Sequence, residues 1–198
     1  NNPSKRKEMS SNMSMMFQHC ALFSSLSNLE NVMFPLKQHT KLPLDIITDI
    51  AVIKLRMVGL HEDAFNKYPS EISGGMLKRV ALARTIVLDP KIIFLDEPNA
   101  GLDPHSARSM DELIEYLKNE LQMSVVMITH DLGVISETAD HVIVMYAGKK
   151  VEEASVIDLF KKPNHPYTQG LMKAIPNIDQ ISKNKGKPER LQEIKGIV

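Results

Sequence analysis

The chain has 198 residues, of which 43% are hydrophobic and 24% charged, close to an average globular domain. This composition excludes disordered and collagen-like classes, and the single cysteine, Cys20, excludes an internal disulfide and fits a reducing compartment. Lys plus Arg and Asp plus Glu both total 24, and 5% of the residues are aromatic. Neither a basic field nor a stacking surface for nucleic acid is therefore expected.

Two features of the first thirty residues concern a membrane span and the start of the chain. Residues 9–29 are free of charge but broken by Ser, Asn, Gln and His, so no direct membrane span is expected. The sequence opens Asn1-Asn2-Pro3 without an initiator Met, and residue 1 is expected to be an internal position of a longer chain.

Apolar runs and helical spacing alternate along the chain. Strands are predicted where apolar residues run without interruption, at 13–18, 92–95, 124–128 and 142–145, the last followed by a tight turn at Ala147-Gly148 into residues 150–152. Helices are predicted over 44–58 with Gly59 as cap, 76–88, 104–121, a short segment to 137, after Ser155, and from 167. Residues 24–27 are expected to form a loop and residues 31–36 a turn. Strands that alternate with helices predict an α/β fold with a mainly parallel sheet.

Polar residues that can carry chemistry follow two of the predicted strands. Asp96 and Glu97 end the run at 92–95, and His130 and Asp131 follow the run at 124–128. Ligands of parallel sheets bind outside the carboxyl ends of the strands, so these groups are expected at one edge. One carboxylate there can hold a hard cation while the next orients an attacking water. Alternatively, Glu97-Pro98 only begins a loop and His130 is a structural histidine.

Ser73-Gly74-Gly75 directly precedes a predicted helix. Bare backbone amides and a hydroxyl at a helix N-terminus form an anion site that the helix dipole favours. The alternative is an ordinary capped turn, because serine is common at helix starts.

Five motifs occur in one chain order: Ile72-Ser73-Gly74-Gly75-Met76, a helix with Arg79, Ala81, Leu82, Ala83 and Arg84, Ile92-Ile93-Phe94-Leu95-Asp96-Glu97-Pro98, Ala100-Gly101-Leu102-Asp103-Pro104 and Thr129-His130-Asp131. Together they resemble the nucleotide-binding domain of an ABC transporter, from residue 17 to about residue 176. The resemblance implies a P-loop NTPase-like, mainly parallel sheet, with a helical signature subdomain at about 28–90 and a catalytic core at about 91–152. A polar tail is expected over 177–198.

Four residues at the strand ends take roles through this resemblance. Asp96 would be the Walker B aspartate that holds Mg²⁺, and Glu97 the general base that polarises the attacking water. Gln18 would be the Q-loop glutamine, which contacts the metal and the γ-phosphate and faces the membrane partner. His130 would be the switch histidine at the γ-phosphate. The implied ligands are ATP and Mg²⁺, and the implied activity is ATP hydrolysis coupled to transport.

The remaining motif residues imply a second subunit. Ser73, Gly74 and Gly75 would bind the γ-phosphate of the ATP held by the other subunit, and Asp103 would be the D-loop aspartate at the dimer interface. Hydrolysis would then need a head-to-tail dimer, with transmembrane permease subunits as further partners. The implied location is cytoplasmic, peripheral on the cytoplasmic face of the inner membrane.

The sequence contains no G-x-x-x-x-G-K-[ST] loop, since Gly148-Lys149 and Gly186-Lys187 lack both the upstream Gly and the following Ser or Thr. The chain is therefore expected to be an N-terminally truncated, partial ATPase domain over 1–176, which supplies the signature half of a composite site. A non-catalytic remnant that acts as an interaction module is the alternative. An ABC-type ATPase of DNA repair or translation is less favoured, because no long coiled-coil insertion is seen.

Local resemblances indicate two kinds of cargo. Residues 16–23, residues 31–36 and the pair Gly75-Met76 resemble the ATPase subunit of Mla-type phospholipid transporters. Residues 165–171 instead resemble the tail of oligopeptide-transporter ATPases. Lipid or small-solute transport is predicted, with the cargo and its direction left open.

Overall fold

The computed structural model describes residues 12–173, which fall into two compact units. The first unit ends at His130 and the second begins at Asp131. Each unit has its own hydrophobic core. The predicted polar tail over 177–198 lies outside the described residues.

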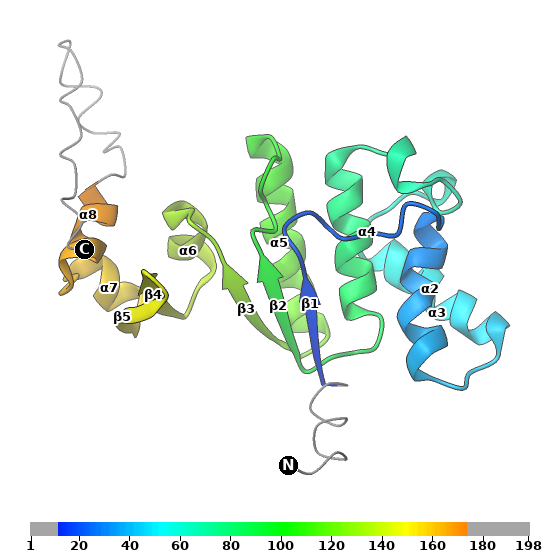
Figure 1. The fold of residues 1–198 in the computed structure, drawn as a ribbon, viewed down its shortest axis with the longest axis horizontal. Coiled ribbons are helices and arrows are strands. Elements are labelled where there is room, and N and C mark those ends of the chain that lie inside the picture. Colours follow the sequence, from blue (N-terminus) through cyan, green and yellow to red (C-terminus); the bar gives the residue numbers. More distant parts are fainter. Residues whose placement is uncertain (1–11, 174–198) are drawn as a thin grey trace. The chain divides into compact units, whose positions relative to one another are not determined.

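A three-stranded parallel sheet forms the centre of the first unit (Figure 1). Its order is β1 (Met13–Met16), β2 (Ile92–Asp96), β3 (Ser124–Ile128), so β2 pairs on both sides. Ile93 and Leu95 of β2 are fully buried, as expected for an apolar strand in a parallel sheet. The predicted α/β fold with a parallel sheet is confirmed, and only the first strand is shorter than the predicted 13–18.

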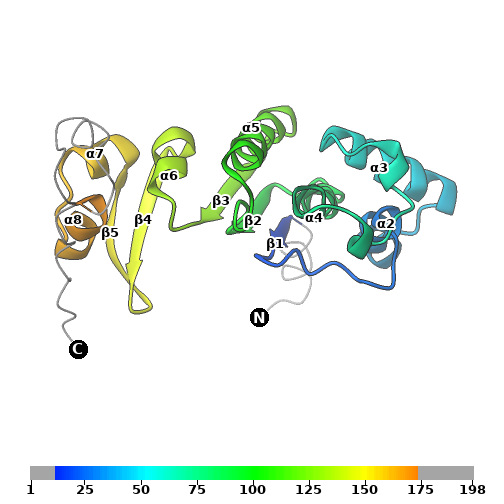
Figure 2. The ribbon, with the colours of Figure 1, turned by 90° about the horizontal axis from the view of Figure 1, so that it is seen from above.

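Helices pack beside the strands of this unit. They are α2 (Asn28–His39), α3 (Leu44–Met57), α4 (Gly74–Ile86) and α5 (Pro104–Glu120), with two short 3₁₀ helices at Glu62–Ala64 and Pro69–Glu71. Helix α4 packs on β1 and on both α2 and α3. Figure 2 shows α4 and α5 on the same side of the strands. Met110, Ile114 and Leu117 of α5 share one buried core with the apolar side chains of β2.

Helix α2 corrects the sequence prediction, because residues 31–36 are helical and do not form a turn. Ser27 and Glu30 make a capping box: the Ser27 hydroxyl accepts from the Glu30 N–H at 3.2 Å, and Glu30 accepts from the Ser27 N–H at 2.8 Å. Pro35 lies inside the helix, where it removes one backbone donor. The buried Asn31 amide donates to the carbonyls of Phe23, Leu26 and Ser27, which anchors the helix to the preceding loop.

Helix α4 also begins earlier than predicted. Ser73 is its N-cap, with the hydroxyl 3.4 Å from the Met76 N–H, and Gly74 and Gly75 form its first turn. The glycines therefore belong to the helix, because the serine cap supplies a partner for a first-turn amide. Helix α3 ends as predicted: Gly59 follows Val58 with φ +70°, the left-handed conformation that favours glycine after a helix.

The second unit is built around a β-hairpin, β4 (His141–Tyr146) and β5 (Lys149–Ser155), which pair antiparallel. Ala147 and Gly148 both have positive φ, as a tight two-residue hairpin turn requires, so the predicted turn is confirmed. Three helices complete the unit: α6 (Leu132–Thr138), α7 (Val156–Lys161), which Ser155 caps as predicted, and α8 (Pro166–Lys173). The strand predicted at 142–145 is thus present, but in this separate sheet.

No helix in residues 12–173 is both long enough and apolar enough to cross a membrane.

Replacing Ser27 by Ala is expected to lower the free energy of unfolding by about 1 kcal/mol, because the N-cap hydroxyl of α2 is lost. Chemical denaturation followed by circular dichroism measures the change. Ser25→Ala, at an exposed serine nearby, is the matched control and should change the free energy by less than about 0.5 kcal/mol. Equal losses in the two variants would contradict the capping role.

Glu30 gives α2 a contribution that depends on pH. The backbone N–H of Ser27, and then its hydroxyl, lower the pKa of Glu30. Its stabilisation is therefore complete above the ordinary glutamate range and is lost as the pH falls through the lowered pKa. The difference in unfolding free energy between the natural chain and Glu30→Gln should shrink across the acid range, and a difference that stays constant would refute this.

Candidate functional site

The parallel register brings the ends of three strands to one edge of the sheet. The last residues of β1 and β3 lie beside the last two residues of β2. Gln18 follows β1 by two residues, His130 follows β3 by two residues, Asp96 ends β2 and Glu97 follows it directly. The structure therefore places these four residues, all expected from the sequence, around one carboxyl edge.

The Glu97 carboxylate contacts His130 directly. Its Oε1 accepts from the His130 backbone N–H at 3.1 Å and lies 2.7 Å from His130 Nδ1. An ionised carboxylate only accepts hydrogen bonds, so Nδ1 carries the proton in this contact. The Glu97 side chain is 18% exposed and the His130 side chain 87% exposed. The pair therefore joins a shielded carboxylate to an imidazole that solvent or a ligand can reach.

The backbone of Glu97 is held in an uncommon conformation. Its φ is +46°, in the left-handed region that a residue with a side chain rarely adopts. The Glu97 N–H donates to the Ile128 carbonyl of β3 at 2.9 Å, and the Glu97 carbonyl accepts from the Ala100 N–H at 3.1 Å. Strained residues of this kind persist where surrounding contacts over-determine them, and they concentrate at functional sites.

Asp96 and Gln18 fit a magnesium site by their chemistry. Both supply hard oxygen donors at the same edge, and Mg²⁺ is commonly held by one or two carboxylates together with substrate phosphates and water. Residues 12–173 hold no group of three or more His, Cys, Asp or Glu side chains arranged for a metal. The donor set thus fits a cation that takes most of its ligands from a bound phosphate and water.

Lys78 of α4 reaches the backbone of two of these residues. Its ammonium donates to the Gln18 carbonyl at 2.7 Å and to the Glu97 carbonyl at 3.1 Å. Lys78 is not among the site residues expected from the sequence. The sequence signal that could have identified Lys78 is its place among the buried positions of a helix, because a buried charge needs polar partners.

Arg84, also on α4, holds the segment that follows Gln18. Its guanidinium donates to the carbonyls of Cys20 at 2.7 Å and Ala21 at 2.8 Å, and both of these residues have positive φ. Burial raises the pKa of the Cys20 thiol, against smaller opposing effects of Lys78 and Arg84. Burial also lowers the pKa of Arg84. Cys20 is thus held as a buried thiol, in line with the absence of any chemical role predicted for it.

Ser73, Gly74 and Gly75, the residues of the predicted signature motif, form the N-cap and the first turn of α4. A Cβ added to Gly74 would meet no described atom within 4 Å, and one added to Gly75 would meet only Leu102 Cδ2, at 4.0 Å. The backbone at the start of α4 is therefore open to a ligand. Within the first unit, the added Gly75 Cβ would border Leu102, the residue before Asp103.

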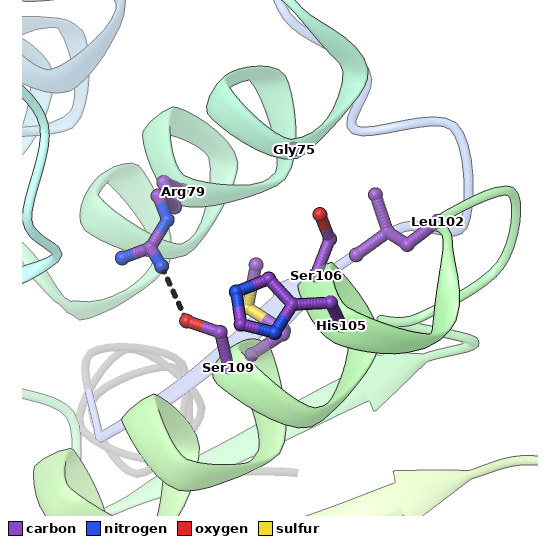
Figure 3. A pocket seen from close by; sticks show the side chains of 7 residues that line it. Gly75, Arg79, Leu102, His105, Ser106 and Ser109 are labelled. Atoms are coloured by element: carbon purple, nitrogen blue, oxygen red, sulfur yellow. Dashed lines mark hydrogen bonds between the residues drawn. The ribbon is translucent and has the colours of Figure 1, made fainter.

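A pocket of about 210 Å³ separates the start of α4 from α5. Its lining residues are Gly75, Arg79, Leu102, His105, Ser106, Ser109 and Met110. Figure 3 shows Arg79 directed at Ser109, to whose hydroxyl it donates at 2.9 Å. Arg79 also donates to the Val58 carbonyl. The arginine thereby ties α4 to the end of α3 and to α5, and it fixes the position of the signature helix.

Asp103, the expected D-loop residue, caps α5. Its Oδ1 accepts from the N–H groups of His105 and Ser106, each at 3.1 Å. Hydrogen bonds from Ser106, through its side chain and then its backbone, lower the pKa of Asp103. The exposed carboxylate is therefore kept ionised and in a fixed place on the helix.

Two family profiles match the chain. The family described as "ABC transporter" matches residues 1–100, and the family described as "Oligopeptide/dipeptide transporter, C-terminal region" matches residues 151–196. The second match overlaps the predicted oligopeptide-transporter-like motif at 165–171.

Several curated proteins are similar in sequence. The oligopeptide transport ATP-binding protein AppD of Bacillus subtilis is 45% identical over 75% of this chain and 44% of its own length. A probable peptide ABC transporter ATP-binding protein of Sinorhizobium fredii is 42% identical over 75% of the chain and 43% of its own length. A methionine import ATP-binding protein, MetN, of Streptococcus agalactiae is 38% identical over 88% and 48%. The chain thus spans less than half the length of these relatives.

Solved structures agree on the fold. The ATP-binding cassette MJ0796, in a dimeric post-hydrolysis state bound to ADP and Pi, gives a TM-score of 0.69 at 28% identity over 79% of this chain and 68% of that chain. The protein cbiO1 of Clostridium perfringens, part of the ABC transporter complex cbiONQ, gives 0.74 at 27% identity over 92% and 72%. The sheet, the ordered motifs and these matches agree, and the chain belongs to the ABC transporter family, with the fold of its ATP-binding cassettes.

Proposed function

We propose that this chain provides part of the ATP-hydrolysing subunit of an ABC transporter that imports peptides or another small solute. The observation that carries the proposal is the Glu97 carboxylate, which is shielded, bonded to His130 and adjacent in sequence to Asp96 at the edge of the sheet. Partly shielded carboxylates at such an edge suit the activation of a water molecule. Residues around a transferring phosphoryl group promote its hydrolysis mainly by positioning the reactants and by stabilising charge.

Each residue at this edge has a proposed role. Glu97 accepts a proton from the attacking water, and His130 fixes the Glu97 carboxylate through Nδ1 while its exposed side chain faces the phosphate. Asp96 and Gln18 hold Mg²⁺, which neutralises charge on the phosphates of ATP when bound. These roles follow the family resemblance, and the contact between the shielded Glu97 carboxylate and His130 supports them.

The signature residues and Asp103 are proposed to act on a second subunit. Gly74 and Gly75 leave the start of α4 accessible, and amides at a helix N-terminus favour phosphate. The resemblance to ABC cassettes implies a head-to-tail dimer, in which these residues complete the site of the other subunit. Transmembrane permease subunits are the further proposed partners, and the place of action is the cytoplasmic face of the membrane.

Peptides are favoured over lipids as cargo. The C-terminal match belongs to oligopeptide and dipeptide transporters, and the similar proteins include named peptide and methionine transporters. The resemblance to Mla-type phospholipid transporters rests on short segments near Gln18 and on Gly75-Met76, and these relatives give it no support.

Glu97→Gln is expected to abolish ATP turnover in the natural gene product that contains these residues, and to trap ATP-bound dimers. The amide keeps the shape of the side chain but cannot take the proton. Phosphate release and size-exclusion chromatography with ATP measure the two effects. Glu115→Gln, at an exposed position of α5, is the control for the lost charge. Unchanged turnover in Glu97→Gln would falsify the role of Glu97.

The 198-residue chain by itself is expected to bind ATP weakly, because its sequence has no G-x-x-x-x-G-K-[ST] loop to hold the phosphates. Adding an ABC subunit that contains this loop should raise the affinity, since the signature residues then meet a held nucleotide. Titration with fluorescent ATP, with and without that subunit, measures the difference. If affinity is unchanged by the subunit, the chain acts as a non-catalytic interaction module.

A further inference from the structure

Lys78 is a buried cation whose ammonium donates to two main-chain carbonyls of the proposed site. It is 6% exposed, and its ammonium lies 2.7 Å from the Gln18 carbonyl and 3.1 Å from the Glu97 carbonyl. Gln18 lies beyond the end of β1 and Glu97 beyond the end of β2. One side chain therefore joins α4 to the segments that leave two neighbouring strands.

We propose that Lys78 is a positioning residue, which fixes the backbones of Gln18 and Glu97 so that their side chains are set for hydrolysis. The proposal rests on the ATPase function proposed above for this site. It assigns Lys78 no contact with ATP, and it predicts an effect on the catalytic step rather than on nucleotide affinity.

The Glu97 backbone needs such support because of its conformation. With φ at +46°, Glu97 is held by hydrogen bonds to Ile128 and Ala100, and the Lys78 ammonium adds a third contact. A charged donor gives a stronger hydrogen bond than a neutral one. Without Lys78, the peptide that follows the catalytic carboxylate has fewer restraints in an unfavourable region of φ and ψ.

The Gln18 segment depends on α4 in a similar way. Cys20 and Ala21, which follow Gln18, have φ of +63° and +48°, and Arg84 holds both of their carbonyls. Lys78 holds the carbonyl of Gln18 itself. The same helix thus holds the carbonyl of Gln18 and those of Cys20 and Ala21 and, through Lys78, the backbone of Glu97. A displacement of α4 would move the two site residues together.

Lys54 of α3 is a natural control for a purely structural role. It is also 6% exposed, but its ammonium pairs with Asp89 at 2.5 Å. Asp89 follows α4 and is no part of the strand-end site. Loss of either buried ammonium leaves a polar partner without its cation, so both variants are expected to lower stability.

Amide hydrogen exchange on the 198-residue chain tests the inference without ATP. In Lys78→Met, the amides of Cys20 and Glu97, which donate to Phe17 and Ile128, should exchange about tenfold faster than in the natural chain. In Lys54→Met they should keep their rates after correction for global stability, and Lys78→Arg should restore them. If Lys78→Met does not fold, Lys78→Gln, which keeps an N–H donor group without the charge, is measured in its place. Equal exchange in the Lys78 and Lys54 variants would overturn the proposal.

Steady-state kinetics of the natural gene product give the catalytic readout. Lys78→Met should lower kcat about tenfold or more with KM for ATP changed less than about twofold, because a misplaced catalytic group slows the chemical step. Lys54→Met should keep kcat, and Lys78→Arg should recover most of it. An inactive unsubstituted protein would refute the ATPase function, and the exchange measurement would still decide the role of Lys78. Unchanged kcat in Lys78→Met of an active protein would refute the positioning role.

Discussion

The parallel pairing of β2 with a strand on each side is the constraint on which the site depends. Parallel strands direct their carboxyl ends to the same edge, so one register fixes where three loops begin. Residues separated by more than a hundred positions in sequence, such as Gln18 and His130, then lie at one edge of the sheet. A shift by one residue in β2 would turn Ile93 and Leu95 out of the core. The burial of these two side chains thus secures the position of Glu97.

The helices and strands that were predicted well from the sequence have periodic or continuous apolar patterns. The strand ending in Asp96 and Glu97 is a short apolar run, and α3 and α5 repeat apolar residues at helical spacing, so their approximate bounds followed from local physics. Helix α2 was missed because Pro35 and buried polar residues interrupt its pattern. Its start was nevertheless readable, since Ser27 followed three residues later by Glu30 is a capping box. The grouping at the strand ends was thus predictable, while the helix beside it was not recognised.

The contacts of α4 with the site could not be predicted from sequence. Lys78 meets Gln18 across 60 positions and Arg84 meets Cys20 across 64, and the acceptors are main-chain carbonyls, which every residue possesses. No pairing of side-chain types marks such contacts. The sequence also contains no sign of the left-handed backbone at Glu97, Cys20 and Ala21, because none of these residues is a glycine. Cargo was hard to assign from sequence for a related reason, because short similarities near Gln18 and near residue 165 pointed to different transporters. The longer C-terminal match and the similar curated proteins favour peptides.

Helix α4 carries both the open backbone that follows Ser73 and the Lys78 ammonium that contacts the strand-end site. Its first turn, capped by Ser73, presents the open backbone of Gly74, whereas Lys78 in the next turn holds Gln18 and Glu97. These positions are four residues apart, or about 6 Å along a helix. Such a short and regular segment behaves as a rigid body, and Arg79, the residue after Lys78, anchors it to α5. A ligand that moved the start of α4 would therefore act on the backbone of Glu97 through the Lys78 ammonium, without contacting the Glu97 carboxylate.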